Sequence, residues 1–337
     1  MDAASELADV TGCVNDLRFG AVAIGRNEGD RLKRCIESLS VAASVVYVDS
    51  GSTDESVQWA RNKGADVVEL DRRSGFTAAR ARNAGFARLR ELAPGLRYVQ
   101  FVDGDCELRE GWPGHALRFL QAHPNAGAVC GRRRERFPNQ SVYNWLCDEE
   151  WNTPPGEARA CGGDAMLRVD ALASVDGYRE DLIAGEEPEL CVRLRAAGWR
   201  IWRLDREMTF HDAAMTHFSQ WWRRALRSGY AFAQGARLHG EAPERHWVWE
   251  SRRAWIWGLY LPLACFAAGF AFPWGWTTWL IFPLQMLRQT ARNKGPLRDR
   301  LTMAFFQILA RFAEACGQIK FVGTRLAGAE ARLIEYK

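Results

Sequence analysis

The chain has 337 residues, of which 47% are hydrophobic and 26% are charged. This balance is typical of a folded globular protein and excludes a disordered chain, and the length allows one large domain or two moderate ones. The formal net charge is only +4, which argues against nucleic acid as the main partner.

A polar segment at residues 1–18 lacks the apolar core of a signal peptide, so we expect the protein to act in the cytosol. After it, short apolar runs alternate with helical patterns. This alternation predicts β-α-β units, hence a Rossmann-like α/β fold with a mostly parallel central sheet flanked by helices. Ligands of such sheets bind beyond the carboxyl ends of the strands. The predicted strands are Phe19–Gly25, Val45–Asp49, Val67–Leu70, Tyr98–Asp103 and Gly127–Gly131, and the predicted helices are about Asp30–Leu39, Thr53–Lys63 and Phe76–Leu92.

The cysteines are scattered between Cys13 and Cys316 without any CxxC pair. Their number is nine, which is odd, and the chain is long. A disulfide framework is therefore not expected, and a reducing compartment is favoured. We interpret the cysteines as small buried residues.

The second predicted strand ends at Asp49, where a carboxylate would face the cleft and accept hydrogen bonds from a nucleobase or ribose. Ser52 and Glu55, three residues apart, predict a capping box that opens the next helix. No GxGxxG motif follows the first strand, which argues against a dinucleotide-binding fold.

The strand that ends at Asp103 continues as Asp103-Gly104-Asp105. In extended geometry residues two apart point the same way, so both carboxylates would face one site. Gly104 would let a ligand approach the backbone closely. Two hard oxygen ligands on a short loop suit Mg²⁺ or Mn²⁺ carrying a diphosphate. An ordinary surface turn is the alternative interpretation of this sequence.

Acidic residues also precede a predicted helix at about Pro188–Ala197, which Gly198 ends. Pro188 suits its first position, which would place Glu187 at the N-cap. The helix dipole there keeps a carboxylate ionised and able to act as a base. Farther along, His211 could supply a neutral imidazole to a metal.

Residues 254–287 carry no charge at all. The arm Ala254–Phe272 is about 19 residues long, near the length that spans a bilayer core, whereas the arm Thr277–Leu287 is too short. Basic residues flank both ends, so a hairpin that enters the membrane and returns to the cytoplasmic side is favoured. A buried helical pair in a soluble domain is the alternative.

The order of these features resembles glycosyltransferase family 2, which has a GT-A fold. The resemblance covers about residues 19–235. It rests on Ile24-Gly25-Arg26-Asn27-Glu28, Asp49-Ser50-Gly51-Ser52-Thr53-Asp54, Gly75-Phe76, Arg82-Asn83, Asp103-Gly104-Asp105, Gly162-Gly163-Asp164, Glu186-Glu187, Leu190, Arg193 and Gln220-Trp221-Trp222-Arg223-Arg224.

The resemblance implies an inverting transfer of a sugar from a UDP- or GDP-linked donor, assisted by Mg²⁺ or Mn²⁺. Asp103 and Asp105 would form the DxD motif, with Asp105 the direct metal ligand and His211 a further one. Glu187 would deprotonate the acceptor hydroxyl. The donor-binding residues would be Asn27, Glu28, Asp49, Arg82, Asp103, Asp105, Arg223 and Arg224, and the acceptor-side residues Gly162, Gly163, Asp164 and Glu186.

The resemblance also implies partners: a nucleotide-sugar donor, a lipid-linked or polysaccharide acceptor, and a membrane surface. The arginine run 132–136 would then be available to acceptor phosphates. We expect the protein at the cytoplasmic face of a bacterial inner membrane, held there by residues 254–287. With one hairpin and no multi-span channel, a single addition is predicted rather than processive synthesis.

Three departures from the family pattern bear on these roles. Ile24-Gly25-Arg26 replaces the usual Pro-x-Tyr, and Ser50 replaces a second Asp, which affects the contacts to the base and ribose. Glu187 replaces an Asp, so its reach differs. Two other interpretations stay open: a sugar-nucleotide pyrophosphorylase, and a catalytically degenerate membrane-associated scaffold.

We therefore expect three parts along the chain. A polar segment, 1–18, precedes a glycosyltransferase domain at 19–240. That domain has a donor half at about 19–131 and an acceptor half at about 132–240. A membrane-associating helical region, 241–337, comprises the hydrophobic hairpin at about 254–287 and a basic amphipathic tail at 288–337.

Overall fold

The computed structural model of the chain describes residues 18–71 and 75–328. The expected polar segment at 1–18, apart from its last residue, and the end of the predicted tail lie outside these residues. The chain divides into two compact units: residues up to Leu182 together with Glu186–Ala214 form the first, and Ile183–Gly185 together with residues from Met215 onward form the second. The division thus falls before the expected boundary at residue 240.

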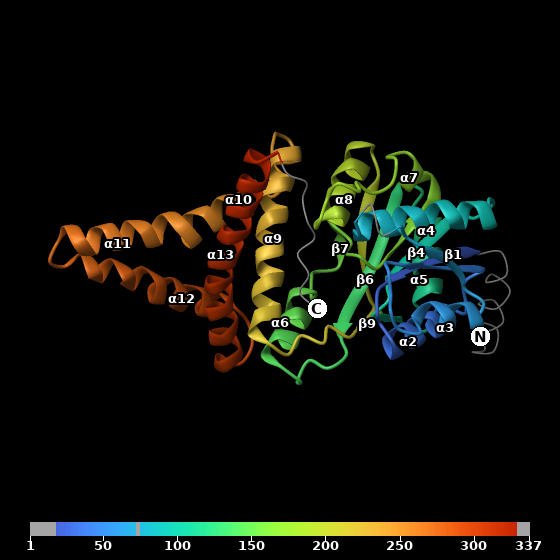
Figure 1. Cartoon of the computed structure of the whole chain (residues 1–337), viewed down its shortest axis with the longest axis horizontal. Helices are drawn as coiled ribbons and strands as arrows, with labels where there is room; N and C mark the ends of the chain where they lie inside the picture. The colour runs from blue at the N-terminus through green and yellow to red at the C-terminus, as the bar shows by residue number, and fades with distance from the viewer. Residues whose placement is uncertain (1–17, 72–74, 329–337) are drawn as a thin grey trace, which may run out of the picture. The chain divides into compact units, whose positions relative to one another are not determined.

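The first unit is built around a nine-stranded sheet whose strand order is β3-β2-β1-β4-β8-β6-β9-β5, with β7 paired to β9 (Figure 1). The first strands along the chain confirm the predicted ones to within one or two residues. The strands are β1 (Phe19–Gly25), β2 (Ser44–Asp49), β3 (Asp66–Glu69), β4 (Tyr98–Asp103), β5 (Cys106–Leu108), β6 (Ala126–Glu135), β7 (Gly156–Glu157), β8 (Ala165–Arg168) and β9 (Arg200–His211).

The expected parallel pairing holds for part of the sheet: it includes β6 with β9 but not β8. Strands β1 to β4 pair in parallel, but β8 runs antiparallel to both of its neighbours, β4 and β6. The reason is where β8 begins: Asp164 stands just before it and accepts the backbone N–H of Asp103, the last residue of β4. A strand that starts at the carboxyl end of its neighbour has to run the opposite way.

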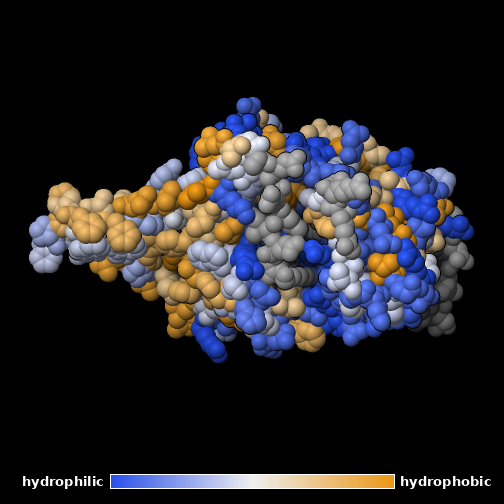
Figure 2. Space-filling model, viewed as in Figure 1, coloured by the Kyte–Doolittle hydropathy of each residue, from blue (hydrophilic) through white to orange (hydrophobic). Residues whose placement is uncertain are grey.

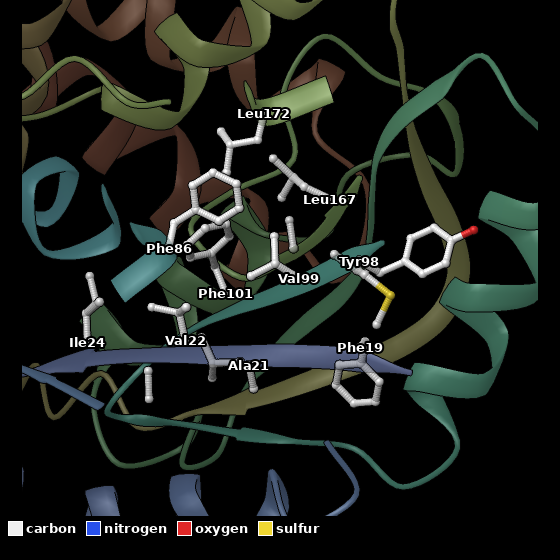
Figure 3. Close-up of a cluster of buried hydrophobic side chains, with 14 of the residues drawn as sticks. Phe19, Ala21, Val22, Ile24, Phe86, Tyr98, Val99, Phe101, Leu167 and Leu172 are labelled. Carbon is white, nitrogen blue, oxygen red and sulfur yellow. The ribbon is translucent and has the colours of Figure 1, made fainter. Parts of the chain in front are cut away.

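Helices of the first unit bury small and apolar residues against this sheet. In α4 the hydroxyl of Thr77 caps the start by accepting the N–H of Arg80, and Gly85 lets the helix approach closely, because a Cβ there would lie 2.3 Å from Val22. Phe101 of β4 is fully buried in this core (Figure 3). The helices are α2 (Asp30–Ser38), α3 (Ser56–Asn62), α4 (Ala78–Leu92), α5 (Trp112–Ala122), α6 (Val142–Glu150), α7 (Val169–Ala173) and α8 (Glu186–Ala196).

Two helix starts differ from the prediction. The capping box at Ser52 and Glu55 does not form: α3 begins at Ser56, and the hydroxyl of Ser52 instead accepts the backbone N–H of Asn27. Helix α8 begins at Glu186, so Glu187 lies in its first turn rather than at the N-cap. Proline is tolerated throughout the first turn, because the N–H groups there have no partner within the helix.

The second unit consists of helices. Its longest members, α9 (Phe218–His239) and α13 (Leu297–Leu326), pack so closely that a Cβ at Gly229 or at Gly317 would lie 2.0 Å from backbone oxygens of the facing helix. This packing explains why α9 groups with the C-terminal helices rather than with the sheet. The remaining elements are α10 (Val248–Trp255), a π-helical turn (Ile256–Tyr260), α11 (Leu261–Ala271), a 3-10 turn (Gly275–Leu280) and α12 (Ile281–Arg292).

The expected hydrophobic hairpin is formed by α11 and α12 with the turn between them. Figure 2 shows hydrophobic residues gathered over these two helices. Within the described residues, one helical stretch, Val248–Ala271, is long and apolar enough to cross a membrane by length and composition. Near the bend, the ring of Trp276 packs edge-on against Phe266 and Phe270. The hairpin therefore has an ordered tip of its own.

Candidate functional site

The site lies at one edge of the sheet, where three strands end together. Register pairs Gly25 with Asp49 and Ile24 with Asp103, so the carboxyl ends of β1, β2 and β4 coincide. This is the edge at which open α/β sheets bind ligands. Gly104 follows Asp103 and donates its N–H to the carbonyl of Ile24 at 2.7 Å, which bends the chain immediately after β4.

Asp103 is held between two guanidinium groups. Its Oδ1 accepts from Arg82 and its Oδ2 from Arg133, both at 2.8 Å. Burial alone would raise the pKa of Asp103, but the two arginines outweigh it and hold this pKa well below the usual carboxyl range. Asp103 is therefore ionised at neutral pH and shares two cations with its neighbours.

Asp164 contacts both Asp103 and Arg133 and so holds their ion pair in place. Its Oδ1 accepts the backbone N–H of Asp103 at 2.9 Å, and its Oδ2 accepts the hydroxyl of Thr209 at 2.8 Å and lies 3.0 Å from Nε of Arg133. The expected acceptor-side residue Asp164 is thus almost fully buried and acts on the end of β4. Its role toward an acceptor stays a prediction.

Asp105 lies beside His211, with Oδ2 of the carboxylate 3.3 Å from Nε2 of the imidazole. Burial, and then the charge of Arg133, lower the pKa of His211, so the imidazole is neutral and can offer a lone pair. Neighbouring ligands of one small divalent cation are separated by about 3 Å. The Asp105–His211 pair therefore fits Mg²⁺ or Mn²⁺.

The other face of His211 is also held. Its Nδ1 lies 3.5 Å from Oε2 of Glu135, and the indole of Trp151 meets the imidazole edge-on with 4.6 Å between ring centroids. A carboxylate behind a ligating imidazole orients the ring and fixes the tautomer, as in many metal sites. Glu135 and Trp151 therefore support the predicted ligand His211.

The acidic pair that opens α8 divides between two environments. Glu186 accepts from Arg82 at 2.7 Å and so joins the network of Asp103. The Oε1 atom of Glu187 accepts the backbone N–H of Cys161 at 2.7 Å and the thiol of Cys191 at 3.0 Å. Both carboxylates are buried, and only Glu186 has an arginine as its partner among the contacts of the described residues.

The predicted nucleoside contacts form a local network at the ends of β1 and β2. Asp49 accepts from the backbone N–H of Gly51 and of Ser52 at 2.8 Å, and Asn27 accepts the N–H of Thr53 at 2.7 Å. Glu28 pairs with a neighbouring arginine, Arg31. These side chains shape the loop, and their contact with a donor stays a prediction.

Glycines line the Asp103 side of the site. A Cβ at Gly163 would lie 2.7 Å from Arg82 and 3.0 Å from Asp103, so glycine lets this loop approach the ion pair. Gly162 before it has φ +81°, a conformation that favours glycine. The predicted Gly162-Gly163 segment is thereby brought to the site.

The arginines of the run at residues 132–136 pair with acids, and their role toward acceptor phosphates stays a prediction. Arg132 pairs with Asp148, Arg134 with Glu207 and Arg136 with Glu107, while Arg133 is taken by the Asp103 network. A run of arginines along a strand meets acids on the neighbouring elements, which sequence spacing alone does not show. The expected diphosphate contacts Arg223 and Arg224 lie in α9 of the second unit, and their role stays a prediction.

The sequence analysis missed the place of four contributors in this network: Arg133, Glu135, Trp151 and Thr209. The predicted strand Gly127–Gly131 stops short of β6, which continues to Glu135. Residues two apart on a strand face the same side, so extending that strand would have placed Arg133 and Glu135 together. No sequence signal singles out Thr209.

Comparisons with known proteins agree with this geometry. The model of the family described as "Glycosyl transferase family 2" matches residues 22–171. The succinoglycan biosynthesis protein ExoA of Rhizobium meliloti (strain 1021) is 26% identical over 206 residues, which cover 56% of this chain. The match spans only 61% of that relative's length.

Solved structures share the fold at low sequence identity. The mannosyltransferase PcManGT from Pyrobaculum calidifontis, solved in complex with GDP-Man and Mn²⁺, is 18% identical with a TM-score of 0.58, covering 90% of this chain and 87% of that chain. A mycobacterial protein is 19% identical with a TM-score of 0.50, covering 70% of this chain and 80% of that chain. Residues 22–171 are therefore similar to glycosyl transferase family 2, and the chain shares the GT-A fold.

Proposed function

We propose that the chain is an inverting glycosyltransferase that moves a sugar from a UDP- or GDP-linked donor to a hydroxyl group of a saccharide or lipid-linked acceptor. The family model and the relative named for succinoglycan biosynthesis support transfer to a growing saccharide. A GT-A relative in complex with GDP-Man and Mn²⁺ supports a nucleotide-sugar donor.

The observation that carries this proposal is the Asp105–His211 pair with its 3.3 Å separation, next to Asp103 and its two arginines. Asp105 and His211 would hold Mg²⁺ or Mn²⁺, with Asp103 beside them. A divalent cation bound there would neutralise charge on the departing nucleotide diphosphate. Arg82 and Arg133 lie at the same edge and hold Asp103 in place beside this cation.

The proposed roles of Glu187, Asn27 and Asp49 follow from their positions in the fold. Glu187, at the positive end of helix α8, would take the proton of the acceptor hydroxyl as it attacks the anomeric carbon. Its Oε1 already accepts two hydrogen bonds, so Oε2 is the atom that we assign to the proton. Asn27 and Asp49 would contact the nucleoside at the ends of β1 and β2.

We also propose that the hairpin holds the protein at the cytoplasmic face of a membrane without crossing it. Phe270 and Trp274 at its tip are 82% and 81% exposed. Two hydroxyls of the tip bond internally: those of Thr277 and Thr278 donate to the carbonyls of Trp274 and Gly275. Such satisfaction is what hydrocarbon requires of a polar group. The basic flanks suit anionic headgroups on one side.

The test is nucleotide binding by calorimetry with the detergent-purified full chain. UDP and GDP are titrated in Mn²⁺ and then in excess EDTA, using wild type, Asp105→Asn and, as a control, Asp66→Asn. Asp66 starts β3 at the opposite edge of the sheet. We expect one nucleotide to bind only with metal, and Asp105→Asn alone to abolish binding.

Failure of both nucleotides to bind folded protein in Mn²⁺ would overturn the donor site. Binding without release of nucleotide from the corresponding UDP- or GDP-sugar would favour the scaffold interpretation instead. Binding with turnover to a hydroxyl acceptor, and inversion at the anomeric carbon seen by NMR, would establish the proposal.

A further inference from the structure

We propose that Cys191, together with Cys161, is a positioning residue for the general base Glu187. The inference rests on the proposed function, because it concerns the base of that reaction. It explains how a glutamate can occupy a position where the family pattern has the shorter aspartate.

The three side chains form one buried cluster on two elements. Glu187 and Cys191 lie one turn apart on α8, and Cys161 precedes Gly162 on the loop that approaches Asp103. The Oε1 atom of Glu187 accepts the Cys161 N–H at 2.7 Å and the Cys191 thiol at 3.0 Å, and the two sulfur atoms are 3.7 Å apart.

The direction of these hydrogen bonds can be assigned. Cys191 has one thiol proton and donates it to Glu187, so the thiol of Cys161 has to be the donor in the contact between the sulfurs. Burial raises the pKa of Cys191. In Cys161 the hydrogen bond with Cys191 lowers the pKa, but burial and the charge of Glu187 together raise it to about 12. Both thiols are therefore protonated near neutral pH and can serve as hydrogen-bond donors.

This chain of donors has two effects on Glu187. It holds Oε1 back against α8 and so takes up the extra methylene of glutamate, which leaves Oε2 to face the acceptor. It also stabilises the ionised carboxylate, because hydrogen bonds to the charged form favour that form. The base is thereby aimed before the acceptor arrives.

The experiment compares Cys191→Ala, which removes the donor, with Cys191→Ser, which keeps one. Cys265→Ala deletes a buried thiol in α11 of the second unit and serves as the control. The readout is nucleotide release from the UDP- or GDP-sugar whose nucleotide binds, measured against pH, with water as acceptor where no other is known. Calorimetric nucleotide binding is measured for every variant.

We expect Cys191→Ala to lower kcat about tenfold with unchanged nucleotide binding, the loss of one hydrogen bond to a charged group. The acidic limb of its kcat profile should move to higher pH, because the carboxylate loses a stabilising donor. Cys191→Ser should keep both values near wild type. In a Glu187→Asp background, whose carboxylate no longer reaches Cys191, Cys191→Ala should cost nothing further.

The inference fails if Cys191→Ala binds nucleotide and keeps the wild-type kcat and pH limb, or if its losses are equally large in the Glu187→Asp background. Stoichiometric zinc in the purified wild type, released by Cys191→Ala, would also overturn it by making the cluster a metal site. Failure of the proposed function looks different, because wild type itself would then show no metal-dependent nucleotide binding or no turnover.

Discussion

The two units of the molecule differ in the kinds of side chain that they bury and expose. In the first, charged side chains such as Arg82, Glu187 and Asp164 are buried at the ends of the strands, and each has a partner. In the second, large apolar side chains such as Phe270 and Trp274 are exposed. Burying a charge costs free energy unless it is paired, and a contiguous exposed apolar surface marks a binding site.

This difference indicates which kind of substitution should affect each unit most. In the first unit the buried charged side chains pair with one another. The stability of this network should therefore be sensitive to the loss of any single charge. The second unit exposes apolar side chains, so the proposed membrane contact should be sensitive to the loss of apolar area. Substitutions of charged residues in the first unit and of apolar residues in the second should therefore change different measurable quantities.

The largest expected effect is on catalysis in the first unit. Glu187→Gln keeps the shape of the base but cannot accept a proton, so transfer should fall about 10²–10⁴-fold while nucleotide binding is unchanged. Release of nucleotide and calorimetry measure the two quantities. Glu157→Gln, at an acid exposed on β7, is the control and should behave as wild type. A Glu187→Gln enzyme with a rate near that of wild type would disprove the assignment.

The next effect is on stability. Arg133→Met leaves Asp103 and Asp164 without one of their cations, and breaking a buried pair in this way costs about 3–5 kcal/mol. Arg134→Met, at the neighbouring ion pair with Glu207, whose side chains are 49% and 42% exposed, should cost about 1 kcal/mol or less. Urea unfolding of both variants measures the free energies. Equal losses would mean that burial is not what distinguishes the two arginines.

The same substitution should change the acid sensitivity. In the folded protein the pKa of Asp103 is lowered, so its contribution to stability is complete above the pKa of an unfolded aspartate and is lost as pH falls through the folded value. Removing Arg133 raises that folded pKa. The destabilisation by Arg133→Met should therefore shrink in urea experiments carried out at progressively lower pH.

A smaller effect is expected on membrane binding. Phe270→Ser and Trp274→Ser should each weaken partition to anionic lipid vesicles about tenfold, because burying such a side chain contributes about 1.5–3 kcal/mol. Phe137→Ser removes an aromatic ring that is 47% exposed in the first unit, and should leave partition unchanged. Vesicle sedimentation provides the measurement. If the control weakens partition as much as the tip variants, the hairpin is not the membrane contact.

The smallest effect is at the surface of the first unit. A hydrogen bond from Arg88 lowers the pKa of Asp66, so this pair stabilises the fold above the pKa of an unfolded aspartate and ceases to do so as pH falls through the lowered value. Arg88→Ala should shift the urea midpoint slightly near neutral pH and not at all in strong acid. A shift that persists in acid would point to lost packing instead.

The alternation of the sequence predicted β1 and β4 to the residue, and with them Asp103 and Asp105 at a strand end. These features depend on local patterns. Arg133 and His211 come to the site through β6 and β9, whose pairing joins residues far apart in the chain, and no local pattern encodes such a register. The sequence indicated His211 through its residue type and the family resemblance, but not its position beside Asp105.

The missed capping box shows a second limit of predicting a helix start from sequence. Asn27 has φ +54°, which turns its backbone N–H toward the hydroxyl of Ser52, and that contact competes with the cap. Ser52 is equally suited to both partners, so the tertiary contact decides. The antiparallel β8 was missed for the same reason, since its direction follows from where Asp164 meets Asp103.

The division of the chain has a consequence for modularity. Ile183–Gly185 belong to the second unit although the chain on either side of them belongs to the first. Within the second unit, Ile183 packs with Tyr230, and a Cβ at Gly185 would lie 2.5 Å from Trp247. If the sheet unit were expressed alone, these three residues would lose their partners in the second unit. They would then be exposed directly before Glu186 and Glu187. Chimeras that exchange the helical part between relatives therefore have to carry this tripeptide with it.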